Sequence, residues 1–173
     1  MKKAKLGTAA GHPLSHLRFW SVVGLGLLAD LLSKWYAWEK LADIPEQTQE
    51  VIPGILDWKL VYNPGVAFGL KLGWWPILFA VVVGIVLIVW LFLASSKSAL
   101  SYHIGLGLIL SGALGNLVDR LTEPFMVRDF IKFSFWYTFN LADAFLCVGV
   151  VLVGLCILRA GPSQRKRLEQ LGA

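Results

Sequence analysis

Four long apolar stretches dominate this chain of 173 residues and constrain its fold more than any other feature. They cover residues 18–38, 74–94, 102–120 and 139–159. Each has the ~20 residues that a helix, rising about 1.5 Å per residue, needs to cross a hydrocarbon layer about 30 Å thick. Because lipid offers the backbone no hydrogen-bond partner, each stretch is expected to be helical. With 57% hydrophobic and 16% charged residues, the chain is predicted to be an all-α membrane protein with four transmembrane helices in a single domain, residues 1–173.

Lysine and arginine predict the orientation of these spans. They are concentrated in the amino-terminal arm, at Lys97 between the second and third spans, and in the tail 160–173, where acidic residues are nearly absent. The positive-inside rule therefore places both termini and the tail in the cytoplasm. The basic balance follows from this topology, and no sequence feature indicates nucleic-acid binding. The first span lacks a small-residue cleavage site, so it is not expected to be a cleaved signal peptide.

Two segments, 39–73 and 121–138, then face outward and carry many aromatic residues. The stretch "GILDWKLVYNPGVAFG" lies in the first segment, and its β-branched and aromatic residues between turn-forming residues indicate a strand or hairpin. In the second segment, "MVRDFIKFSFWYTF" partly alternates between polar and apolar residues, which is typical of an extended stretch. Since Trp and Tyr favour the headgroup level, we expect a small extracytoplasmic β-sheet that rests on the membrane.

Polar residues converge at the outer ends of the spans. The predicted topology brings together residues from three separate spans and from the loop before the fourth, at one depth near the outer leaflet. These residues are Asp30 and Lys34 in the first span, Asn116, Asp119 and Arg120 in the third, Asp129 in the loop, and Asn140 and Asp143 in the fourth. Ionisable groups at such depth cost roughly 2.5–3.5 kcal/mol each on insertion scales unless they face a partner or water.

A purely structural role remains open for several of these residues. Asp30 and Lys34 are four residues apart on one helix face and can form an ion pair. Asp119 can pair with Arg120 or with Arg128 and so orient helices. Asn140 can simply cap a helix, which is a structural role. A structural role is harder to assign to Asp143, because no basic residue lies within one turn of it.

Two carboxylates in a poorly hydrated pocket cannot both ionise easily, so one keeps its proton while the other acts as a base. Such a pair can activate water against a peptide carbonyl and protonate the leaving amine. Serine and metal mechanisms lack their parts, since His12, His16 and His103 lie at the cytoplasmic side. The residues therefore favour a carboxylate pair.

Five motifs in register with the four spans resemble lipoprotein signal peptidase, also called signal peptidase II. They are "DLLSK" (30–34), "NPGVAFG" (63–69), "GALGNLVDR" (112–120), "VRDF" (127–130) and "FNLADA" (139–144). Each is short, but their order and spacing match the family from about residue 18 to 160. The resemblance implies an enzyme of the bacterial cytoplasmic (inner) membrane with its active site toward the extracytoplasmic face.

The resemblance also implies residue roles and a substrate. Asp129 and Asp143 match the family's catalytic pair. Positions that bind substrate or position the pair match Asp30, Lys34, Asn63, Gly65, Asn116, Asp119, Arg120 and Asn140. Enzymes of this family cut diacylglyceryl-modified prolipoproteins just before the lipidated cysteine and use no metal and no cofactor. We expect prolipoprotein and membrane lipid as partners, no nucleic acid, and a monomer.

The sequence departs from the family pattern at two places. Nine residues, Ile131 to Phe139, lie between Phe130 of the "DF" motif and Asn140 of the "FN" motif, where the family often has a longer stretch, so we expect an outer loop of a different shape. Ser111 stands where a glycine is common before "GALGN". Neither departure touches the proposed pair.

A membrane carrier or ion-conducting protein is the alternative from another class, because buried Asp and Asn residues often mark ion paths. It predicts polar residues on both sides of the midplane, but the cytoplasmic halves of the four spans are almost purely apolar. A structural subunit that uses its ion pairs only for assembly is a further alternative, and it predicts that Asp143→Asn leaves function intact.

Overall fold

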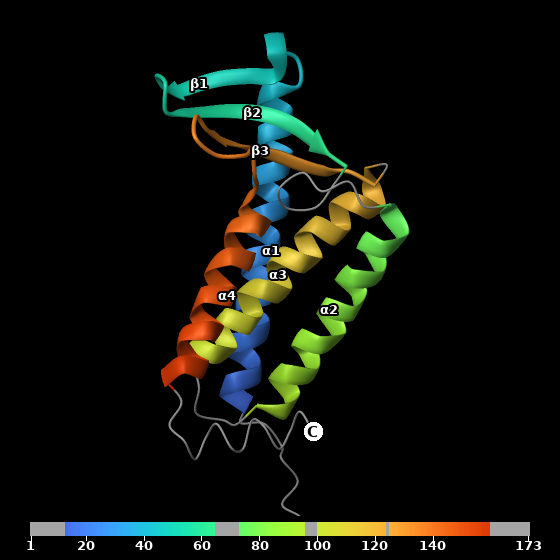
Figure 1. Ribbon diagram of the computed structural model, residues 1–173, viewed down its shortest axis with the longest axis vertical. Coiled ribbons are helices and arrows are strands. Elements are labelled where there is room, and N and C mark those ends of the chain that lie inside the picture. The colour runs from blue at the N-terminus through green and yellow to red at the C-terminus, as the bar shows by residue number, and fades with distance from the viewer. Residues whose placement is uncertain (1–12, 65–72, 96–99, 124, 160–173) are drawn as a thin grey trace, which may run out of the picture.

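The computed structural model describes residues 13–64, 73–95, 100–123 and 125–159. Long helices form a bundle with a small sheet at one end, and α1 begins and α4 ends at the opposite end of the bundle (Figure 1). The helices are α1 (Pro13–Leu41), α2 (Trp74–Ala94), α3 (Leu100–Thr122) and α4 (Leu141–Arg159), with a short 3₁₀ helix, η1 (Pro45–Gln47). The strands are β1 (Thr48–Ile52), β2 (Leu56–Asn63) and β3 (Val127–Phe133).

Among the described residues, α2, α3 and α4 are long and apolar enough to cross a membrane. Three of the predicted spans are therefore matched by helices at nearly the predicted bounds. The predicted first span lies within α1, where Asp30 and Lys34 lower the hydropathy, and its crossing of the membrane stays a prediction. Large apolar side chains such as Leu25 and Phe79 are exposed on the outside of the bundle, whereas the charged side chains of Asp30 and Lys34 on α1 are fully buried. This inside-out distribution suits a lipid environment.

The sheet confirms the extended structure predicted in both outer segments. Its strands are antiparallel in the order β1-β2-β3. Val61 on β2 pairs with Asp129 on β3, so the carboxyl end of β2 lies beside the acid-bearing part of β3. The sheet packs on the last turns of α1 through a hydrophobic cluster of Ala37, Leu41, Leu60 and Phe130. This packing holds β3 over the end of the bundle that carries the sheet.

Helix α3 contacts each of the other three helices and lies against α4 at very short range. Two glycines make the approach possible. A Cβ atom on Gly112 would collide with the carbonyl oxygen of Ala142, and one on Gly149 would lie 2.6 Å from the carbonyl oxygen of Gly105. Small residues at a helix interface let the backbones come together in a membrane, where apolar burial alone provides little drive. The contact at Ala142 places the first turn of α4, which contains Asp143, directly against α3.

Gly112→Ala is expected to destabilise the protein by about 1–3 kcal/mol, the usual cost of overpacking a closely packed contact. The added methyl group meets backbone, which cannot rotate away, and Leu146 at 2.8 Å. Thermal unfolding in detergent should show a lower midpoint and lower peptidase activity. Gly24→Ala on α1 is the matched control, because nothing lies within 4 Å of its added Cβ. An unchanged midpoint for Gly112→Ala would show that α3 and α4 are not tightly apposed here.

Ser111, the departure from the family pattern in α3, has a specific neighbour. Its side chain is fully buried and donates a hydrogen bond of 2.8 Å to the carbonyl oxygen of Leu108. A Cβ atom on Gly26 would lie only 2.6 Å from the Ser111 hydroxyl oxygen. The larger residue on α3 is therefore accommodated by a glycine on α1, and it does not reach the polar cluster at the outer end.

Candidate active site

The start of α4 is built by a reciprocal pair of hydrogen bonds. The Asn140 side-chain oxygen accepts from the Asp143 backbone N–H at 3.0 Å, and the Asp143 carboxylate accepts from the Asn140 backbone N–H at 3.4 Å. This is the geometry of a capping box, which satisfies N–H groups that a helix start leaves without partners. Asn140 precedes α4 as its N-cap, which is the capping role considered for it from the sequence. The cap fixes the side chain of Asp143 in the first turn.

Asn140 also joins the two candidate acids, so capping is only part of its role. Its amide nitrogen donates to Asp129 at 2.7 Å and lies 3.1 Å from the side-chain oxygen of Asn116. The amide nitrogen of Asn116 donates to Asp143 at 2.8 Å. Two buried asparagines from α3 and from the start of α4 therefore hold one carboxylate each and contact one another. The structure brings Asp129 and Asp143 into one polar cluster.

Asp129 lies in an environment that favours its protonated form. It is 2% exposed, and its carboxylate also accepts from the Asn63 side-chain nitrogen at 3.0 Å. Burial, followed by the negative charge of Asp143, raises the pKa of Asp129 to about 7, although its hydrogen bonds from Asn63 and Asn140 and the charge of Lys34 act in the opposite direction. A carboxyl group with such a pKa can hold a proton near neutral pH and release it during a reaction.

Lys34 is the buried cation that connects α1 to the cluster. Its ammonium group lies 2.8 Å from the Asp30 carboxylate, 3.2 Å from that of Asp119, and 3.0 Å from the side-chain oxygen of Asn116. The predicted pair of Asp30 with Lys34 is confirmed as part of this larger network. Asp30 in turn accepts from the backbone N–H of Ala142 at 2.8 Å. An ion pair on α1 therefore also positions the first turn of α4.

Arg128 lies in the cluster but is not among the site residues predicted from the sequence. Its guanidinium lies 2.7 Å from the Asp119 carboxylate, and its backbone N–H donates to the same carboxylate at 2.9 Å. Of the two arginines considered as partners of Asp119, Arg128 forms the ion pair. The pair ties the start of β3 to the end of α3, one residue before Asp129. In the sequence, its position directly before Asp129 is the feature that could have indicated a role at this site.

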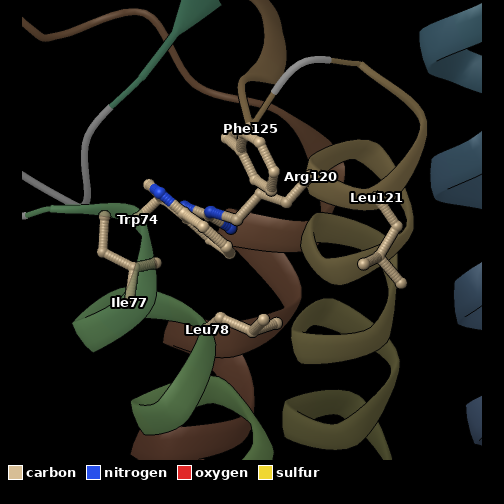
Figure 2. A pocket seen from close by; sticks show the side chains of 6 residues that line it. All are labelled: Trp74, Ile77, Leu78, Arg120, Leu121 and Phe125. Carbon is tan, nitrogen blue, oxygen red and sulfur yellow. The ribbon is translucent and has the colours of Figure 1, made fainter.

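Arg120 extends toward a pocket beside the cluster. Its guanidinium donates to the carbonyl oxygen of Asn116 at 3.0 Å. It also interacts electrostatically with the carboxylates of Asp143 and Asp129. Figure 2 shows the pocket between α2 and α3 from close by. It is lined by Trp74, Ile77, Leu78, Arg120, Leu121 and Phe125. Five of these six lining residues are apolar, and Arg120 adds a cationic side chain to the wall.

The predicted site residues that the structure describes lie in this cluster or at its edge. They are Asp30, Lys34, Asn63, Asn116, Asp119, Arg120, Asp129, Asn140 and Asp143. Gly65 lies outside the described residues. Among the described residues, no three His, Cys, Asp or Glu side chains are grouped as metal ligands would be.

Comparison with known proteins shows the family of the chain. Residues 22–159 match the family model for signal peptidase (SPase) II. The chain belongs to the signal peptidase II family. The lipoprotein signal peptidase of Syntrophomonas wolfei is 38% identical over 154 residues, covering 86% of this chain and 99% of that protein. That of Polynucleobacter necessarius is 39% identical over 150 residues, covering 81% and 88%. The resemblance in the sequence motifs is thus confirmed.

Solved structures support the same fold. A bacterial membrane enzyme determined by the in meso method at 2.3 Å resolution aligns with a TM-score of 0.74 and 25% identity, over 82% of this chain and 87% of that chain. A second, at 1.9 Å resolution, aligns with a TM-score of 0.71 over 83% and 94%. As a member of the signal peptidase II family, the chain is a membrane protease of the aspartic type, and this excludes the carrier alternative.

Proposed function

We propose that the chain removes the signal peptide from diacylglyceryl-modified prolipoproteins, cutting on the amino side of the lipidated cysteine with Asp129 and Asp143 as the catalytic pair. The observation that carries this proposal is the joining of the two acids through Asn140 and Asn116 at 2.7 Å and 2.8 Å. The aspartic type of the family and the names of the relatives support it. The enzyme works as a monomer in the bacterial cytoplasmic membrane, with this site toward the outer face.

The proposed mechanism divides the work between the two carboxyl groups. Asp129, whose pKa of about 7 favours the protonated form, holds the proton that the leaving amine will need. Asp143 accepts a proton from a water molecule, and this water attacks the peptide carbonyl carbon. The carbon–nitrogen bond then breaks as Asp129 protonates the amine. Asn116 and Arg120 are placed to bind the substrate backbone or the developing oxyanion.

The remaining buried residues hold the segments that carry the two acids in place. Lys34 and Asp30 connect α1 to the start of α4, and Asp119 connects α3 to β3 through Arg128. None of Lys34, Asp30 and Asp119 has any exposed surface. We therefore infer that these three position the pair and do not touch the substrate.

A matched pair of substrates tests the proposed function. Purified enzyme in lipid vesicles is incubated with a prolipoprotein that carries the diacylglyceryl group on its cysteine, and with the same protein unmodified. Cleavage before the cysteine is expected only for the modified form, because the enzyme must bind the lipid chains to bring the bond to the acids. Equal cleavage of both forms would contradict the proposed substrate class, while cleavage of neither would contradict the proposed activity.

The pH dependence of cleavage should reflect Asp129. Since the raised pKa of Asp129 is about 7, its carboxyl proton is present below that pH and is lost above it. We expect kcat/KM to fall about tenfold per pH unit above the pKa, as a required acid loses its proton. Asn63→Leu removes a hydrogen bond that favours the ionised form, so the alkaline fall should move to higher pH. A fall that stays in place or moves to lower pH in this variant would contradict the role of Asp129 as the proton donor.

A further inference from the structure

An exposed aromatic turn connects β3 to α4, and the proposed chemistry does not use it. Three consecutive side chains are mostly exposed: Phe135 at 76%, Trp136 at 54% and Tyr137 at 64%. Exposed aromatic groups of this size are costly in water, and a contiguous apolar patch usually marks a contact surface. The turn therefore calls for a partner that removes these rings from water.

The turn is well ordered by its own contacts. The Trp136 backbone N–H donates to the Phe133 carbonyl oxygen at 3.1 Å, and Lys132 donates to the Trp136 carbonyl oxygen. The Phe135 ring stacks on Phe133 with centroids 5.6 Å apart. A turn held in this way presents its aromatic rings in a fixed arrangement.

Neighbouring apolar residues enlarge the surface. The backbone N–H of Ser134 donates to the carbonyl oxygen of Ile55 at 3.0 Å, which places the turn beside the tip of the β1–β2 hairpin. We define the tip patch as the exposed apolar residues of these two adjoining turns: Ile55, Phe135, Trp136 and Tyr137. The patch thus gathers residues from both outer segments at one end of the sheet.

The tip patch lies at the end of β3 away from the acids. Asp129 is near the start of β3, paired with Val61, whereas Phe133 at the other end pairs with Leu56. Four residue steps separate Asp129 from Phe133, where the strand ends, and they span about 13 Å at about 3.3 Å per residue in an extended strand. The patch therefore does not line the site where the peptide bond would be cut.

The aromatic turn lies just before the start of α4 in the chain. Phe139 bridges to Ile131 on β3, and α4 begins at Leu141, four residues after Tyr137. In Figure 1, β3 is the strand nearest the helices, and its connection to α4 turns back at the level of the sheet before it descends to the start of α4. The outer surface of α4 continues below with exposed apolar side chains such as Val148 and Val151. Tyr137 therefore lies four residues before a helix that is apolar enough to span the membrane.

We propose that the tip patch is a membrane anchor that inserts Phe135, Trp136 and Tyr137 into the headgroup region of the leaflet that borders the sheet. Trp and Tyr favour this region because their rings are apolar while their N–H and O–H groups stay hydrated. Lys132, held at the turn, lies where its charge meets lipid phosphates. The anchor supports the sheet at its free end, so that β3 carries Asp129 at a constant depth. This inference does not depend on the proposed chemistry.

Spin labelling of the full-length chain in vesicles tests the anchor. Cys147 and Cys156 are replaced by alanine, and single cysteines are introduced as Phe135→Cys, Tyr137→Cys and, as the matched control, Gln49→Cys. Gln49 is exposed on β1, the strand farthest from the bundle in Figure 1. The vesicles contain phosphatidylethanolamine and phosphatidylglycerol. Collision of the label with oxygen, which concentrates in lipid, is compared with collision with a water-soluble nickel complex.

The expected result is a several-fold lower ratio of nickel to oxygen collisions at positions 135 and 137 than at position 49. Ratios at both positions equal to that at 49 would overturn the proposal by placing the turn in water. Shielding from both reagents would also overturn it and indicate a protein partner. Line broadening between labels at position 135, lost on dilution with unlabelled protein, would identify that partner as a second copy of the chain. Two probe sites guard against a local effect of one substitution.

Discussion

Replacing either Asp129 or Asp143 with asparagine is expected to reduce the turnover of a lipidated prolipoprotein by at least about 10²–10⁴-fold, the range that general acid–base catalysis contributes. Asparagine has nearly the shape of aspartate but can neither accept a proton from water nor donate one to the leaving amine. The Asn140 amide at 2.7 Å from Asp129 and the Asn116 amide at 2.8 Å from Asp143 keep an oxygen to donate to. The variants should therefore fold and bind substrate.

The measurement is single-turnover cleavage of a diacylglyceryl-modified substrate in vesicles, together with binding of the same substrate. Asp57→Asn is the matched control, because this acid lies on β2 of the same sheet and pairs with Lys132, away from the cluster. Its turnover should stay near that of the unmodified enzyme. Turnover within tenfold of normal in either Asp129→Asn or Asp143→Asn would reject the catalytic pair, and it would favour the structural role that these carboxylates could otherwise have.

Lys34→Met is expected to cause the largest loss of stability. The lysine is fully buried and faces the carboxylates of Asp30 at 2.8 Å and Asp119 at 3.2 Å. Removing one partner of a buried ion network leaves uncompensated charge and costs about 3–5 kcal/mol. The measurement is the midpoint of thermal unfolding in detergent. Because Asp30 also holds the backbone of Ala142, the first turn of α4 should loosen and cleavage should fall with it.

Two further variants separate the buried charge from a general effect of losing a lysine. Lys40→Met is the matched control on the same helix, since Lys40 is exposed and lies over the ring of Tyr36. It should change the midpoint little, as exposed charges do. Adding Asp30→Asn to Lys34→Met neutralises the acid that Lys34 pairs with at 2.8 Å, whereas Asp119 keeps its ion pair with Arg128, so the second change should restore part of the lost stability. A Lys34→Met protein as stable as Lys40→Met would show that the lysine is not part of a buried network.

The predicted arrangement of the site came from counting depth along helices. Asp30, Lys34, Asn116 and Asp143 were expected together because each stands at the same end of its span, and the structure joins them in one hydrogen-bonded cluster. Position along a helix follows from the rise per residue, so sequence alone predicts it. Which partner each group chooses depends on the rotation of the helices about their axes. Asp119 accordingly could not be assigned to Arg120 or Arg128 in advance.

Residue order and composition determined the apolar helices, the extended outer segments and the level at which the polar residues gather, because these follow from hydropathy, periodicity and length. Only the tertiary structure decided that Gly112 brings α4 against α3, that Asn140 caps α4 and also contacts Asp129, and that Arg128 ties β3 to Asp119. Each of these depends on side-chain direction and on close backbone approach between segments far apart in the chain. Such contacts are set by packing in three dimensions, which no local pattern of residues encodes.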